Sequence, residues 1–218
     1  MRRSTLVVFA FALAGGQAGA AGNPELGQQK AAVCMACHGP DGNSPALPEP
    51  AQPWPKLAGQ VPEYIVKQIH DFKAGRRSND QMSPQAQMIA DADIADIAAF
   101  FAAQRVTPQE AAQKDLLARG EQIFLKGKGR PQVVAACIGC HGFNGVGNRD
   151  WSKLMAKPPA LLAPAIGGQH ANYLVRQLKA YRDGSRKNDP GKVMADIAGR
   201  LDENEVLAVA EYISTLGH

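Results

Sequence analysis

The sequence predicts an all-α protein made of two tandem domains, and three observations lead to this prediction. The 218-residue chain repeats itself internally, its apolar residues recur at helical spacing, and no stretch alternates convincingly between apolar and polar residues as a β-strand does. Hydrophobic residues make up 45% of the chain and charged residues 20%, which is ordinary for a folded globular protein. We therefore expect each repeat to form a few short helices joined by long loops.

The internal repeat sets the domain boundaries. Shifted by 109 residues, PKLAGQVPEYIVKQIHDFKAGRRSND (55–80) aligns with PAIGGQHANYLVRQLKAYRDGSRKND (164–189), with identical residues at ten of the 26 positions. Repetition at a fixed offset indicates one structural unit present twice. The domains are expected at 21–106 and 107–218, with a linker at 104–113.

The first 20 residues have the pattern of a secretory signal. Two arginines precede an apolar run from Leu6 to Ala14, and small residues follow up to Ala20. The apolar run is shorter than the roughly 20 residues that a membrane-spanning helix needs. We expect cleavage near Ala20 and export of a soluble protein.

Helical signals occupy corresponding places in the two halves. In the first half, Asn23-Pro24 resembles a helix start, and the helix should run into Cys34. Further first-half helices are expected over PEYIVKQIHDFKAG and DADIADIAAFFAAQR, whose apolar residues share one face. The second half should repeat them at about 109–126, 171–182 and 202–216. Three small helices bury little apolar surface, so each half needs a staple or a cofactor.

A Cys-x-x-Cys-His motif stands once in each half. CMACH occupies residues 34–38 and CIGCH residues 137–141. This motif is the signature of covalent haem attachment, and the histidine is the proximal ligand of the iron. Two covalent haem c groups would supply the missing cores. The attachment thiols are then those of Cys34, Cys37, Cys137 and Cys140, and the iron ligands are His38 and His141.

Other uses of four cysteines explain less of the pattern. A disulfide within Cys-x-x-Cys closes a very small loop, stabilises a fold little and leaves the following histidine unexplained twice. A zinc ribbon needs its second cysteine pair about 15 to 20 residues away, whereas here it lies 103 residues away. A thioredoxin-like pair expects neighbouring strands, which this sequence does not predict.

Methionines at repeated positions are the candidates for the sixth iron ligand. A thioether opposite the histidine raises the reduction potential and leaves a closed electron-transfer site. Met82 and Met194 follow the SND and KND turns and stand 11 residues before the acidic residue that opens the last helix. Met88 is the competing candidate in the first half. His70, His170 and His218 have no histidine partner in the other half, and we expect them at the surface or at helix ends.

The mature sequence resembles the dihaem cytochrome c4 group, which consists of two class I cytochrome c domains. Besides the CxxCH motifs, the resemblance rests on the LAGQ and IGGQ turns, the YxxxQ helices and the GxRxND segments that lead to a methionine, each present in both halves. It implies periplasmic electron transfer, commonly toward a terminal oxidase, with His38/Met82 and His141/Met194 as axial pairs. It further implies that the carbonyls of Pro55 and Pro164 orient the proximal imidazoles.

The resemblance also implies close helix packing, and the second half departs from the first in two regions. Gly27 and Gly120 should let the first helix of each half cross closely against the last, near Phe100 and Tyr212. The second half has the extra region FLKGKGRPQV before its motif and the longer segment DWSKLMAKPPALLA after it. Either region would alter a haem edge or a docking surface.

Charge is distributed unevenly, which bears on partners. Residues 21–106 hold seven Lys and Arg against nine Asp and Glu, and residues 107–218 hold fifteen against eleven. Such asymmetry can orient a redox partner protein. No basic stripe with interleaved aromatics indicates nucleic-acid binding. The expected donor is a quinol-oxidising complex or a dehydrogenase, the expected acceptor a haem-copper oxidase, and any membrane association would be peripheral and through partners.

We therefore expect an electron carrier and no enzyme activity of its own. Two alternatives stay open: the haem subunit of a larger dehydrogenase, with a flavoprotein or quinoprotein partner, and a dihaem peroxidase or thiosulfate dehydrogenase. An enzyme of the second kind needs an open or unusually ligated iron, whereas each half here offers a methionine to close the site.

Overall fold

The computed structural model describes residues 22–47, 54–147 and 162–218, and the signal segment lies outside this part of the chain. The described residues form helices and loops, and Lys128 and Val134 form an isolated antiparallel bridge. The all-α prediction is confirmed. None of the helices in the described ranges is both long enough and apolar enough to cross a membrane.

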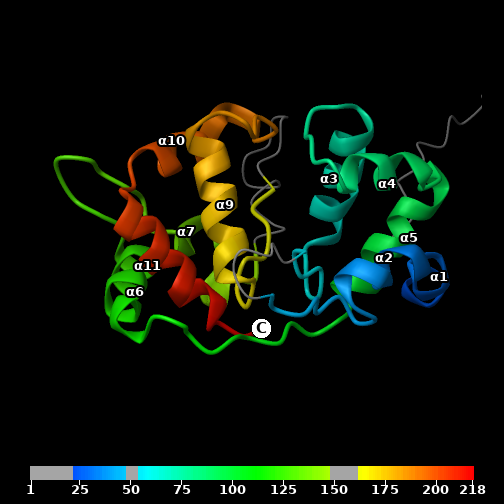
Figure 1. Ribbon diagram of the computed structural model, residues 1–218, viewed down its shortest axis with the longest axis horizontal. Helices are drawn as coiled ribbons and strands as arrows, with labels where there is room; N and C mark the ends of the chain where they lie inside the picture. The colour runs from blue at the N-terminus through cyan, green and yellow to red at the C-terminus, as the bar shows by residue number, and fades with distance from the viewer. Residues whose placement is uncertain (1–21, 48–53, 148–161) are drawn as a thin grey trace, which may run out of the picture.

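Two helical halves lie side by side, and the segment that connects them runs along one side of both (Figure 1). The helices of the first half are α1 (Pro24–Lys30), α2 (Ala32–His38), α3 (Pro62–Lys73), α4 (Met82–Met88) and α5 (Asp91–Ala102). Those described in the second half are α6 (Leu117–Lys126), α7 (Ile138–His141), α9 (Ala171–Arg182), α10 (Val193–Gly199) and α11 (Glu203–Ser214), with 3-10 turns at Lys114–Leu116, Phe143–Gly145 and Pro190–Lys192.

Local sequence signals explain where several helices begin. The Asn23 side chain accepts hydrogen bonds from the backbone N–H groups of the first turn of α1, where Pro24 needs no partner for its nitrogen. Asp202 and Glu205 form a reciprocal capping box at the start of α11. The predicted helix from Asn23 to Cys34 is in fact two helices, because the chain turns at Ala31.

Each half has its own hydrophobic core, closed by a pair of tightly crossing helices. A Cβ atom on Gly27 of α1 would lie 2.0 Å from the backbone oxygen of Asp96 and 2.8 Å from the Cβ of Phe100, both on α5. On Gly120 of α6 it would lie 2.1 Å from an α11 carbonyl oxygen and 2.7 Å from the Cβ of Tyr212. The predicted close crossings at both glycines are confirmed, and only a residue without a side chain permits them.

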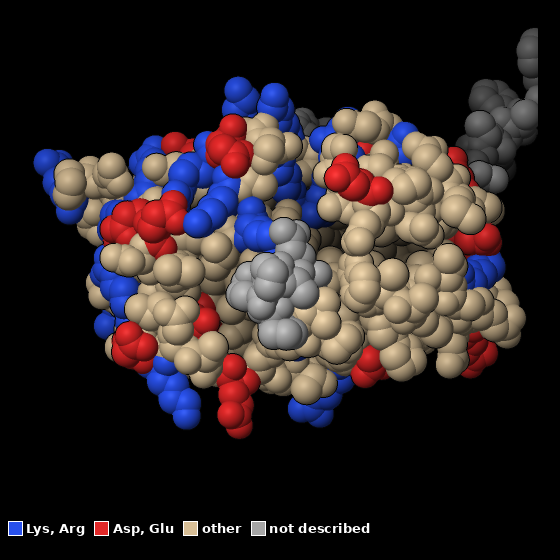
Figure 2. Space-filling view, in the orientation of Figure 1, with Lys and Arg blue, Asp and Glu red and all other residues tan. Residues whose placement is uncertain are grey.

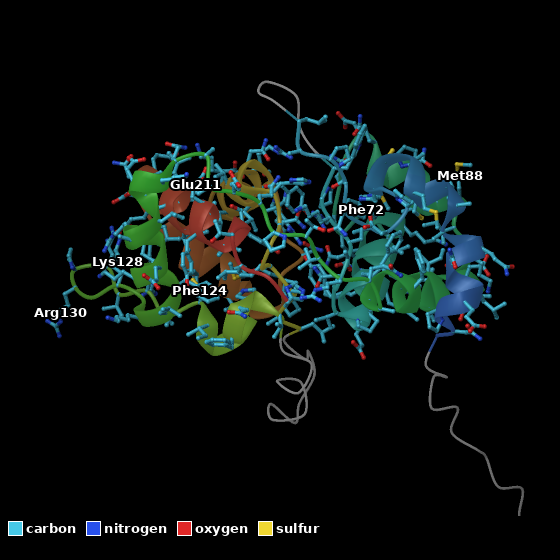
Figure 3. The ribbon with its side chains drawn as sticks, turned by 90° about the horizontal axis from the view of Figure 1, so that it is seen from below. Phe72, Met88, Phe124, Lys128, Arg130 and Glu211 are labelled. Carbon is cyan, nitrogen blue, oxygen red and sulfur yellow. The ribbon has the colours of Figure 1, made fainter. Side chains whose placement is uncertain are left out.

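The extra region of the second half is an excursion away from the core. The chain leaves α6 at Gly127, pairs Lys128 with Val134, and carries Arg130 outward at its tip (Figure 3). Most of the second departure, DWSKLMAKPPALLA, falls within 148–161 and lies outside the described residues.

Candidate functional site

The two CxxCH motifs end short helices at matching places. α2 ends at His38 and α7 ends at His141, and in both cases a glycine with positive φ follows directly: Gly39 at 83° and Gly142 at 76°. Residues other than glycine rarely adopt such a φ. The helix therefore stops at the histidine, which leaves the imidazole at the helix end and buried.

Each of these histidines is held by the proline carbonyl that the resemblance implied. His38 Nδ1 lies 2.8 Å from the Pro55 oxygen, and His141 Nδ1 lies 2.9 Å from the Pro164 oxygen. A carbonyl oxygen only accepts, so Nδ1 carries the proton and donates it. Burial lowers the pKa of both rings, which keeps them neutral and leaves a lone pair on each Nε2 for a metal ion.

The four cysteines form no disulfide and lie partly buried. Burial raises the pKa of the Cys34 thiol to about 11, and it does the same to the Cys137 thiol. Within the described ranges, no three His, Cys, Asp or Glu side chains are grouped to hold one metal ion, so the second ligand pair that a zinc ribbon requires is not formed there.

One continuous cavity of about 760 Å³ brings both motifs together. Both histidines and all four cysteines line it, and so do Met82 on α4 and Met194 on α10. The rest of the wall is largely apolar, with Phe72 (Figure 3), Ile97 and Leu174 among its residues. Paired thiols, a neutral imidazole, a thioether and an apolar wall are the groups that a c-type haem with histidine and methionine ligands uses. The residues present therefore fit two such groups.

Met88 does not share this cavity. Its side chain is 74% exposed and lies at the outer end of the first half (Figure 3), whereas Met82 packs against the hydrophobic core and lines the cavity. Of the two methionines of α4, Met82 lines the cavity and Met88 does not.

Sequence reasoning missed a cluster of polar residues between the halves. Arg186 is buried; it donates to Tyr64 Oη at 2.7 Å and to Gln177 Oε1 at 2.7 Å. Its repeat counterpart Arg77 donates to Tyr173 Oη and Gln177 Oε1, each at 3.0 Å. All of these residues line the cavity. Both arginines stand at the same position of the GxRxND segment. This repetition was the signal in the sequence that could have identified them as functional candidates.

His170 lies at a helix end, one of the two expected places, but it is not at the surface. It stands directly before α9, is 1% exposed, and its Nε2 lies 3.0 Å from the Ser44 hydroxyl of the other half. Because Ser44 donates to the Trp54 carbonyl, it accepts from His170. His218 is half buried and lies against Gly59 of the first half. His70 lies in the last turn of α3.

Family models match each half of the chain. The model described as "Cytochrome c" matches residues 117–217, and the model described as "Cytochrome C oxidase, cbb3-type, subunit III" matches residues 23–101.

Whole proteins with similar sequence and structure cover nearly the entire chain. Cytochrome c4 from Thiocapsa roseopersicina is 43% identical over 89% of this chain and 93% of its own length. The crystal structure of reduced recombinant cytochrome c4 from Pseudomonas stutzeri is 40% identical, covers 90% of this chain and 100% of its own, and superposes with a TM-score of 0.76. A more distant relative, the thiosulfate dehydrogenase electron acceptor of Stutzerimonas stutzeri (strain A1501), is 35% identical over 86% of this chain and 80% of its own length.

These matches confirm the class I cytochrome c fold that the resemblance implied. They also agree with the two CxxCH motifs that line the cavity. The chain therefore belongs to the cytochrome c4 family, as a dihaem c-type cytochrome of electron transport that carries two covalently attached haem c groups.

Proposed function

We propose that the protein is a periplasmic electron carrier, exported by a signal segment that is cleaved near Ala20, with one haem domain at 21–106 and the other at 107–218. It would pass electrons between redox partner proteins and on toward a terminal oxidase. The observation that supports this most is the single cavity, because both motifs and both candidate methionines line it. Two haems in one cavity form a short path for electrons through the molecule.

In this proposal the chain supplies both axial ligands of each haem iron. Cys34, Cys37, Cys137 and Cys140 hold the porphyrins, and the axial pairs are His38 with Met82 and His141 with Met194. When bound, each haem supplies a one-electron couple. The protein fixes the imidazoles through the proline carbonyls and excludes water with the apolar wall. Arg77 and Arg186 are the nearby cations that would offset the carboxylates of the haems.

Such a site favours carrying electrons over catalysis. A substrate needs an open coordination position or a reactive side chain at the iron, and here an imidazole and a thioether are available to each haem. All four cysteines are used for attachment, which leaves no thiolate to serve as a ligand. We therefore expect no turnover of thiosulfate or peroxide by the protein alone.

Charge supports docking to protein partners. On the face seen in Figure 2, Lys and Arg side chains gather on the second half, over α9 and α10, while the same face of the first half is largely uncharged. An uneven field of this kind orients a partner as it approaches. We propose a quinol-oxidising complex or a dehydrogenase as the donor and a haem-copper oxidase as the acceptor.

An optical redox titration of the purified protein tests the ligand set. We expect two haems per chain and the absorption marker of a methionine–iron bond at both. Met82→Ala and Met194→Ala should each remove the marker from one haem, and the double variant should remove it from both. Met88→Ala is the matched control and should leave it intact. A marker that survives in the double variant would refute the proposed ligands.

A second candidate is a haem subunit that serves a dehydrogenase directly. The similarity to the thiosulfate dehydrogenase electron acceptor favours this reading. A thiosulfate dehydrogenase from Marichromatium purpuratum has a solved structure that is 32% identical and matches with a TM-score of 0.72, although this chain covers only 40% of it. Purification of the native protein distinguishes the candidates, because a subunit would bring a second polypeptide with it and a free carrier would not.

A further inference from the structure

Two buried glutamines connect the halves in a symmetric way. Gln60 and Gln169 are repeat counterparts, each the last residue of its LAGQ or IGGQ turn, and they are 8% and 7% exposed. Each side chain reaches across the boundary and meets the backbone of the other half at the residue that follows the histidine-binding proline.

The hydrogen bonds of the two glutamines mirror one another. Gln169 Oε1 accepts from the Lys56 N–H at 2.9 Å, and Gln169 Nε2 donates to the Lys56 carbonyl at 2.9 Å. Gln60 Oε1 accepts from the Ala165 N–H at 2.8 Å, and Gln60 Nε2 donates to the Ala165 carbonyl at 2.8 Å. Each Oε1 also accepts the N–H of its own following residue. Because both partners of each Oε1 are donors, the orientation of each amide is fixed.

These contacts fall on the same peptide groups that hold the histidines. The peptide group between Pro55 and Lys56 accepts the His38 Nδ1 proton at its oxygen and donates its N–H to Gln169. The peptide group between Pro164 and Ala165 does the same between His141 and Gln60. One planar, polarisable unit therefore separates each proximal imidazole from a glutamine of the opposite half.

We propose that Gln60 and Gln169 are positioning residues that set the reduction potential of the haem in the opposite domain. This inference rests on the proposed ligation by His38 and His141. Donation from a peptide N–H polarises the group and makes its carbonyl oxygen a stronger acceptor. A stronger acceptor at Nδ1 makes the imidazole more basic, which favours the ferric iron and lowers the potential. Docking of the two domains thereby tunes both irons.

The test uses Gln169→Ala and Gln60→Ala in the full haem-loaded protein, with each haem followed separately by its hyperfine-shifted NMR signals during a redox titration. Gln169→Ala should raise the potential of the His38 haem, with the reduced-to-oxidised ratio at fixed applied potential rising by about twofold or more. The Nδ1 proton signal of His38 should move as well. Gln60→Ala should do the same to the His141 haem, so that each change acts across the boundary.

Further variants separate this effect from a loosened interface. Gln169→Glu keeps an acceptor for the Lys56 N–H and should not raise the potential. Ser44→Ala removes a bond between the halves, to His170, and a bond to the carbonyl of Trp54, the residue before Pro55. It touches neither Gln60 nor the Pro164–His141 pair, so it should leave the potential of the His141 haem unchanged, whereas a loosened interface would shift it. Because both glutamines also line the cavity, a potential shift without movement of the histidine Nδ1 signal would mean direct contact with the haem and would overturn the inference. Equal shifts at both haems, or a shift in the same domain alone, would also overturn it.

Failure of the proposed iron ligation is distinguishable from failure of this inference, because the wild-type protein would then lack the low-spin histidine-methionine spectrum.

Discussion

Replacement of Gly120 by alanine should destabilise the second half, although alanine is the better helix former. The added Cβ would lie 2.1 Å from the Ala208 oxygen, 2.8 Å from its carbonyl carbon and 2.7 Å from the Cβ of Tyr212. Real Cβ atoms essentially never approach closer than 3.0 Å, so α6 and α11 must part by roughly 1 Å. The separation would disturb Phe124, which is 1% exposed and whose ring centroid lies 5.6 Å from that of Tyr212.

The magnitude follows from two opposing terms. Overpacking costs about 1 to 3 kcal/mol and occasionally more, while the gain in helix propensity from glycine to alanine is about 1 kcal/mol. Two backbone atoms and a side chain all stand inside the contact limit, so we expect the upper end of the cost and a net loss of about 2 kcal/mol. For a domain of about 100 residues, this lowers the melting temperature by roughly 10 °C.

Thermal and urea unfolding of the oxidised protein, followed by far-ultraviolet circular dichroism, measures this loss. Gly199→Ala is the matched control: Gly199 ends α10, and a Cβ added there would meet nothing within 4 Å. It should be neutral or slightly stabilising. If the free energy of unfolding of Gly120→Ala lies within about 0.5 kcal/mol of the wild-type value, the close crossing of α6 and α11 is wrong.

Three further changes should report on buried polar groups. Glu205 is 5% exposed and pairs with Arg119 and Lys128 at 2.5 Å. Glu205→Ala should lower the free energy of unfolding in urea by about 3 kcal/mol. Glu205→Gln should lower it less, because glutamine retains an acceptor for the capping box. Arg186→Ala leaves the Tyr64 hydroxyl without its donor and should cost about 2 kcal/mol or more, and an unchanged urea midpoint would contradict this. Burial lowers the pKa of His170 to about 4, so unfolded chains bind more protons between pH 6.5 and 4. Stability should therefore be full above pH 6.5 and fall by up to about 3 kcal/mol toward pH 4, and His170→Leu should flatten this fall in a pH series of unfolding midpoints.

Local patterns in the sequence predicted much of the fold. The face shared by Ile65, Ile69 and Phe72 predicted α3, and these three residues are buried in the core. The repeat predicted which elements return in the second half. The tight crossings at Gly27 and Gly120 were expected from the resemblance to the cytochrome c4 group, and both are present.

Among the short helices that were not predicted, α4 and α10 each carry a candidate methionine ligand. α4 spans MSPQAQM, in which Pro84 and the polar residues favour a loop; yet a proline in the first turn costs no hydrogen bond, because that nitrogen has no partner in a helix. α10 begins after Lys192, which has a φ of 55°, and is only seven residues long. Short elements of this kind depend on packing more than on propensity.

The contacts between the halves lay beyond sequence reasoning. His170 meets Ser44 across 126 residues of chain, and Gln169 meets Lys56 across 113. Periodicity and motifs describe neighbours along the chain, whereas these contacts depend on how the two halves pack against each other. A histidine with no counterpart in the repeat was therefore expected at the surface or at a helix end.

A hydrogen bond to Thr107, in the linker, makes the two halves of the repeat unequal. Lys56 is buried and donates to the carbonyls of Thr107 and Gly168, and its repeat counterpart is Ala165. The glutamine contacts are those of a two-fold pair, which two separate copies of one domain would make equally well. Thr107 lies in the linker, which the chain contains once, so the lysine contact to it has no repeat counterpart. The buried ammonium of Lys56, like the contact between His170 and Ser44, thus distinguishes the two ends of a pair whose glutamine contacts are symmetric.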